Sequence, residues 1–162
     1  ELWKSDGTAA GTVLVKDIRT GSGGSNPRYL TNVGGTLYFR ANDGTSGYEL
    51  WKSDGTATGT VLVKDILTGG GSSGLSNLTN VSGTLYFSAF DDTNGDELWK
   101  SDGTAAGTVL VKDIRTGSGS SGPRNLTNVG GTLYFSANSG TSGSELWKSD
   151  GTAAGTVLVK DI

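Results

Sequence analysis

The densest group of possible metal ligands lies at residues 90–97, FDDTNGDE. The candidate ligands there are four side chains with carboxylate or amide oxygens that precede Glu97: Asp91, Asp92, Asn94 and Asp96. Such oxygens are the ligands that Ca²⁺ takes, although the spacing differs from that of the twelve-residue EF-hand loop. Two related segments, NDGTSGYE at 42–49 and NSGTSGSE at 138–145, lack most of these acids. We therefore expect at most one calcium site here, and none that recurs along the chain.

An aspartate also recurs in the tetrapeptide Ser-Asp-Gly-Thr. The four positions are Asp6, Asp54, Asp102 and Asp150. Each could contribute to a calcium site, but one acid per turn is too few for tight binding. The favoured interpretation is turn chemistry, because Asp bonds nearby backbone N–H groups and Gly takes positive φ easily.

Aromatic side chains are the candidates for ligand stacking. One tryptophan recurs in each Glu-Leu-Trp motif, at Trp3, Trp51, Trp99 and Trp147. These rings either stack on sugars or fill the space between repeats, and the second interpretation is favoured because every repeat needs the same filler. Tyr48 and Phe90 lie in variable segments and are the candidates for glycan or protein binding.

A glutamate opens each of the same motifs: Glu1, Glu49, Glu97 and Glu145. A retaining glycosidase needs two carboxylates about 5 Å apart, but four equivalent copies argue against one unique active site. Lys16 and Asp17 predict a strand-end charge pair, which contributes under about 1 kcal/mol when exposed. Arg28 and Arg124 are predicted to be solvated in connecting segments.

Composition excludes several classes of function. The net charge of −3 gives no basic face for nucleic acid. No apolar run approaches the ~18 residues that span a membrane. The chain has no Cys and no His, which excludes disulfides, a His-based zinc site and a histidine general base. We expect no cofactor, with calcium as the one possible ion, and no enzymatic activity.

The elements that position these residues come from an internal repeat. The eighteen residues ELWKSDGTATGTVLVKDI at 49–66 occur four times, 48 residues apart, with one position that varies. A period of this length indicates a repeat architecture. The predicted division is a partial repeat at 1–18, followed by full repeats at 19–66, 67–114 and 115–162.

One period predicts four short strands joined by turns. Runs of β-branched and aromatic residues alternate with Gly, Asn and Asp, which is typical of strands and tight turns. The predicted strands of the first period are Glu1–Ser5, Thr12–Ile18, Leu30–Val33 and Thr36–Ala41. The segments 19–29 and 42–48 are predicted to be a connector and a polar loop.

The strands carry apolar residues on both faces, as Val13 and Leu14 do, so both faces must be covered. Sheets stacked as blades would achieve this, and the prediction is an all-β propeller of four-stranded antiparallel blades, about 48 residues per repeat. A β-solenoid is the rival. Three repeats are too few for a ring, since known propellers have at least about four blades. An excerpt of a longer array, a ring closed by several copies and an open arc all remain open.

The motif resembles the ELWxxDGT repeat of large bacterial secreted and surface proteins, on Glu-Leu-Trp, Ser-Asp-Gly-Thr and Gly-Thr at fixed offsets over the whole chain. That family is similar to kelch-type propellers. The resemblance implies a blade and an extracellular or cell-surface location, and it implies no chemistry. Ser5-Asp6-Gly7-Thr8 also resembles the Asp-box turn of sialidase propellers, without the Trp expected close behind it.

These observations favour a non-catalytic structural or interaction module that acts by multivalent display, in which weak contacts add up. The expected partners are neighbouring repeats or further copies of the protein, and a glycan or protein ligand. The alternative is a carbohydrate-binding, lectin-like propeller that uses Tyr48 or Phe90. A glycoside hydrolase-like propeller ranks third.

Overall fold

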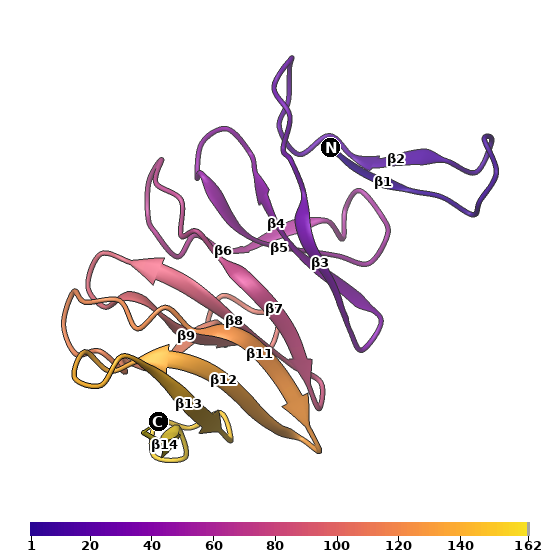
Figure 1. The fold of residues 1–162 in the computed structure, drawn as a ribbon. Coiled ribbons are helices and arrows are strands. Elements are labelled where there is room, and N and C mark those ends of the chain that lie inside the picture. The colour runs from indigo at the N-terminus through magenta and orange to yellow at the C-terminus, as the bar shows by residue number, and fades with distance from the viewer. Residues whose placement is uncertain (162) are drawn as a thin grey trace.

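The computed structural model describes residues 1–161, which form fourteen strands in antiparallel sheets (Figure 1). The N-terminal hairpin pairs β1 (Leu2–Lys4) with β2 (Val13–Lys16). The first sheet contains β3 (Arg28–Val33), β4 (Thr36–Asn42), β5 (Tyr48–Ser53) and β6 (Val61–Lys64). The second contains β7 (Ser76–Val81), β8 (Thr84–Asp91), β9 (Gly95–Ser101) and β10 (Val109–Lys112). The third contains β11 (Arg124–Val129), β12 (Thr132–Asn138), β13 (Ser144–Ser149) and β14 (Val157–Lys160).

In each sheet the strands follow one another in chain order, as tight turns dictate. Gly34 and Gly35 take φ values of 60° and 88° between β3 and β4, as a two-residue hairpin turn requires. Ser82 takes the first of these positions in the second sheet, with φ 51°. The predicted two-residue turns are therefore present.

The strands differ from the sequence prediction at the connectors. β3 begins at Arg28, two residues before the predicted start, and its pairing with β4 is irregular between Arg28 and Thr31. Tyr29 lies in this irregularity with φ 58°, a left-handed conformation. Arg28 and Arg124 are exposed as predicted, but they belong to strands rather than to connectors.

The three sheets stack face to face, and β3, β7 and β11 lie side by side through the stack (Figure 1). The predicted all-β class with four-stranded repeats is confirmed. Residues 1–161 do not close into a ring. The same described part of the chain contains no helix that is long and apolar enough to span a membrane.

Three equivalent cores join the stacked units. Between the first and second sheets, Leu50 and Val63 pack with Phe87 and Trp99. The second and third sheets make the same kind of core, and the N-terminal hairpin covers Trp51 of the first sheet. Each buried tryptophan thus packs against the hairpin or sheet that precedes it in the chain. This arrangement favours packing over sugar stacking for the three buried rings: Trp51, Trp99 and Trp147.

Candidate functional site

Three of the four Glu-Leu-Trp glutamates, Glu1, Glu49 and Glu97, tie their hairpin or sheet to the connector that follows it. Glu49 is fully buried, where its Oε2 accepts a hydrogen bond from the Ile66 backbone N–H at 3.0 Å. Its Oε1 accepts one from the Ser73 N–H at 2.8 Å, on the way to the second sheet. Glu97 binds the next connector through Ser121, whose N–H and hydroxyl donate at 2.9 and 2.6 Å. These two carboxylates therefore hold the backbone of the connectors in position, and their burial leaves them inaccessible to a substrate.

The pKa values of these glutamates are shifted in different directions. Burial raises the pKa of Glu49 to about 7, against the hydrogen bonds that favour the charged form. Burial also raises the pKa of Glu97. Burial acts in the same direction on Glu1, but hydrogen bonds from Ile18, Arg19 and Ser25 outweigh it, and the pKa of Glu1 is lowered.

The aspartates of the Ser-Asp-Gly-Thr motifs stabilise their turns through hydrogen bonds. Asp54 Oδ1 accepts from the Thr56 N–H at 2.9 Å and from the Thr56 hydroxyl at 2.7 Å. The same hydroxyl accepts from the Gly59 N–H at 2.9 Å. These bonds lower the pKa of Asp54, first through the Thr56 hydroxyl. The geometry is that of turn chemistry, and residues 1–161 contain no group of three or more acidic side chains placed to hold a metal ion.

Lysines connect each turn to the preceding sheet, a role that the sequence reasoning missed. Lys52 Nζ donates to the Gly103 carbonyl at 2.9 Å, and Lys64 Nζ donates to the Thr108 carbonyl at 2.8 Å. The same pair of bonds joins the hairpin to the first sheet and the second sheet to the third. Lys16 accordingly reaches across to Thr60, whereas the sequence predicted a pair with Asp17.

A tyrosine completes this contact. A Cβ atom on Gly103 would lie 2.2 Å from the Tyr38 hydroxyl, and one on Gly151 would lie 2.2 Å from the Tyr86 hydroxyl. Glycine is therefore required there for space as well as for its positive φ of 89°. Lys and Tyr repeat at fixed offsets in the sequence, and this signal was not used to predict the contact.

Two equivalent cavities of ≈ 370 and ≈ 460 Å³ lie beside these contacts. Each is lined by a tyrosine and a lysine of one sheet and by the turn aspartates of that sheet and the next. The first set is Tyr38, Lys52, Asp54 and Asp102, and the second is Tyr86, Lys100, Asp102 and Asp150. Burial, with the charge of the facing aspartate, raises the pKa of both tyrosines. In both cavities the lysine donates to a backbone carbonyl and the aspartates accept hydrogen bonds from threonines.

The four calcium candidates do not converge on one point. Asp91 Oδ1 accepts from the backbone of Thr93 and Asn94, and Asn94 Nδ2 donates to Asp91 Oδ2 at 2.9 Å. Asp92 is exposed. Asp96 lies in β9, where it accepts from the Ser88 hydroxyl. The segment 90–97 is thus mostly strand, and Asp91 and Asp96 accept hydrogen bonds from different partners.

Asp96 instead faces Arg124, and both line a cavity of ≈ 340 Å³ between the second and third sheets. Burial raises the pKa of Asp96, and the Ser88 hydrogen bond and the charge of Arg124 act against this rise.

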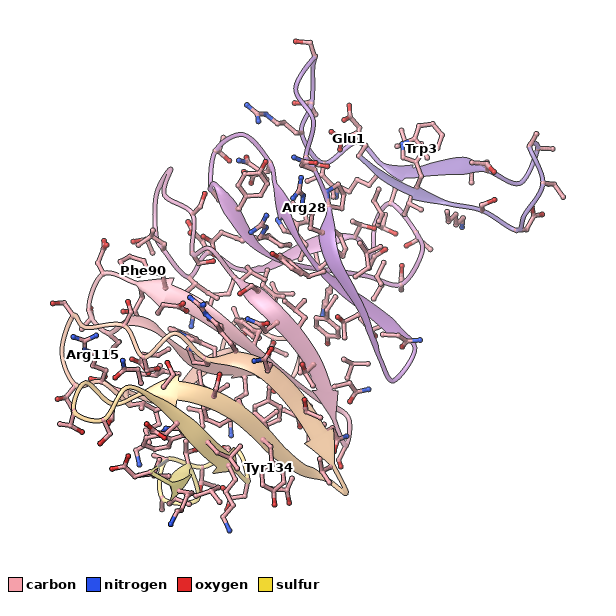
Figure 2. All side chains as sticks on the ribbon, in the orientation of Figure 1. Glu1, Trp3, Arg28, Phe90, Arg115 and Tyr134 are labelled. Carbon is pink, nitrogen blue, oxygen red and sulfur yellow. The ribbon has the colours of Figure 1, made fainter. Side chains whose placement is uncertain are left out.

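The two aromatic candidates, Tyr48 and Phe90, lie next to the loops at 43–47 and 92–94. Tyr48 is half-buried at the start of β5, and the Arg40 guanidinium carbon lies 4.9 Å from its ring centre. The same guanidinium lies 5.1 Å from the ring of Tyr29. Phe90 is half-buried near the end of β8, and Figure 2 shows it at the edge of the stack. The structure does not bring Tyr48 and Phe90 into one site, and the Arg40 pairing was not predicted.

Comparisons with protein families, with curated proteins and with solved structures found no match to this chain.

Proposed function

We propose that this chain is a non-catalytic structural and interaction module in which stacked, propeller-type blades display loops at equal intervals. We further propose that its repeats are of the ELWxxDGT type found in bacterial secreted or surface proteins. The observation that carries it is the recurrence of one set of contacts between successive units. The hairpin and the first two sheets each donate two lysine hydrogen bonds to the following turn, and the first two sheets add a tyrosine. Buried Glu49 and Glu97 each fix the connector that follows them.

The two ends of each sheet differ in how much their turns and loops vary in sequence, and this difference supports the display role. The Gly-Gly and Ser-Asp-Gly-Thr turns, which are nearly invariant, lie at the end where sheets contact one another through the lysines. The variable loops at 43–47, 92–94 and 139–143 connect the other ends of the central strands. Sequence variation is therefore concentrated away from the stacking contacts. Loops on a rigid repeated scaffold bind partners by summing weak contacts.

The first test inserts a second copy of residues 67–114 after Ile114 and measures the free energy of unfolding. Stability in stacked repeats is a sum of unit and interface terms, so the longer chain should unfold at a higher temperature and denaturant concentration. A longer chain that is no more stable, or that unfolds in independent steps, would contradict the stacking role.

A second measurement separates this proposal from its alternatives. The chain is applied to a glycan array and incubated with chromogenic glycosides. We expect neither binding nor turnover. Glycan binding that disappears in Tyr48→Ala would instead support the lectin-like alternative, and turnover of any glycoside would support the hydrolase.

A further inference from the structure

The outer face of the third sheet exposes residues that are buried in the other sheets. Leu146 is 38% exposed, whereas its equivalents Leu50 and Leu98 are fully buried. Val159 is 44% exposed, against 6% for its equivalent Val111. Tyr134 also lies on this face, near the C-terminal end of the molecule in Figure 2. The face thus has the composition of an internal interface without a covering sheet.

The opposite face of the N-terminal hairpin exposes the other half of the same interface. Trp3 is 58% exposed and projects from the hairpin in Figure 2, whereas its three equivalents are 6–7% exposed. Leu14 is 44% exposed and Leu158 of the third sheet is 41% exposed, whereas the equivalents Leu62 and Leu110 are partly buried against the cores. In every covered unit this tryptophan packs against the preceding sheet.

Polar groups on the two faces match as well. Lys148 and Lys160 are exposed, and their ammonium groups form no hydrogen bond within residues 1–161. Their equivalents donate to the carbonyls of a Gly and a Thr in the following turn. In the hairpin those positions are Gly7 and Thr12. A Cβ atom on Gly7 would meet nothing within 4 Å, so the place that a tyrosine hydroxyl takes at Gly103 is open.

We propose that the outer face of the third sheet binds the N-terminal hairpin of a second copy of this chain. This inference rests on the stacking role proposed above. Trp3 and Leu14 of one copy would pack on Leu146 and Val159 of the other, and the two free lysines would donate to the carbonyls of the turn. The contact joins different surfaces, so copies associate head to tail into a ring or a chain.

The contact should be weaker than the internal interfaces. The hairpin contributes two strands and lacks the strand that supplies Phe39, Phe87 and Phe135, the fully buried aromatic residues of the three sheets. Small interfaces are typical of weak, transient association. We therefore expect a reversible equilibrium that depends on protein concentration.

Sedimentation equilibrium of the whole chain, from low to high micromolar concentration, tests the proposal. The mass average should rise with concentration in the wild type and stay at the monomer value in Leu14→Asp. The matched control is Val13→Asp, because Val13 is 40% exposed on the other face of the same strand and should leave association intact. A wild type that stays monomeric, or an equal effect of both variants, would overturn the proposal.

Mixing two defective copies tests the head-to-tail geometry. Leu14→Asp keeps an intact third-sheet face, and Val159→Asp keeps an intact hairpin face. Each should be monomeric alone, and the mixture should form a one-to-one heterodimer that grows no further. A mixture that stays monomeric, or one that forms larger species, would overturn the geometry. Thermal melts of both variants confirm folding, and Leu146→Asp replaces Val159→Asp if that variant does not fold.

The two proposals fail in distinguishable ways. If inserting a repeat raises stability while the wild type remains monomeric, only the second-copy inference is wrong. If the inserted repeat brings no stability, the stacking role itself is wrong.

Discussion

The second sheet and the N-terminal hairpin carry the same eighteen residues in different surroundings. In the second sheet, Trp99 packs in a core between two sheets and is 6% exposed. In the hairpin, Trp3 has no sheet before it and is 58% exposed. The glutamates differ in parallel, since Glu97 is fully buried and Glu1 is not. Identical sequence thus acquires its burial, and with it the pKa of its acids, from the neighbouring repeat.

The largest difference between the two regions should appear on truncating the tryptophans. Trp99→Ala should lower the free energy of unfolding by roughly 3–5 kcal/mol, because it leaves a cavity between sheets. Trp3→Ala should cost less than about 1 kcal/mol at low protein concentration, as an exposed surface substitution does. Urea denaturation of both variants measures the contrast, and equal losses would show that the interior and terminal units are energetically alike.

The glutamates provide the next contrast. Glu49→Ala leaves the N–H groups of Ile66 and Ser73 without acceptors in a buried site, and each such group costs about 1–3 kcal/mol. Glu1→Ala should cost less, because water reaches its site. The measurement is the denaturant midpoint of each variant against the wild type. A larger loss for Glu1→Ala would contradict the anchoring role assigned to burial.

The pH dependence of stability should carry opposite contributions from the same two residues. The pKa of Glu49 is raised to about 7, so its contribution is fully present below the unfolded value of 4.5 and is lost as the pH rises through 7. The pKa of Glu1 is lowered, so its contribution is present above 4.5 and is lost as the pH falls through the lowered value. Melting temperatures from pH 4 to pH 8 should therefore fall less steeply with rising pH in Glu49→Gln than in the wild type. An unchanged slope would contradict the raised pKa.

The lysines should show the smallest effect. Lys52→Met removes one hydrogen bond to the Gly103 carbonyl and should cost about 1 kcal/mol. Lys148→Met removes no hydrogen bond within residues 1–161 and should leave the monomer's stability unchanged. Differential scanning calorimetry at low protein concentration compares the two, and a loss for Lys148→Met equal to that for Lys52→Met would contradict the stacking contact described for Lys52.

The repeat pattern predicted the local structure well because it depends on near neighbours. The Asp-Gly and Gly-Gly turns and the short β-branched strands follow from residues within one period, and the packing role of the tryptophans follows from their recurrence in every period. The partners of Lys52 and Tyr38 lie 51 and 65 residues away, at Gly103. Their identification requires the offset between stacked sheets, which the sequence of one repeat does not contain.

The candidate site was predicted less well for a related reason. Asp91, Asn94 and Asp96 are close in sequence, but the extension of β8 and β9 sends Asp96 toward Ser88 while Asp91 caps the loop. Tyr48 was predicted as a ligand-binding candidate, and its contact with Arg40 of the adjacent strand was not predicted. Side-chain direction in a strand depends on register, and here the register could not be predicted residue by residue.

Amide hydrogen exchange tests the central claim most directly, because it reports the stability of each sheet in one experiment. If burial comes from neighbouring repeats, the amides of β8 and β9 should exchange most slowly, and those of β1, β2 and β14 fastest. The Ile114 amide, held by buried Glu97, should likewise exchange more slowly than the Ile18 amide held by Glu1. Uniform protection from the hairpin to the third sheet would contradict the account.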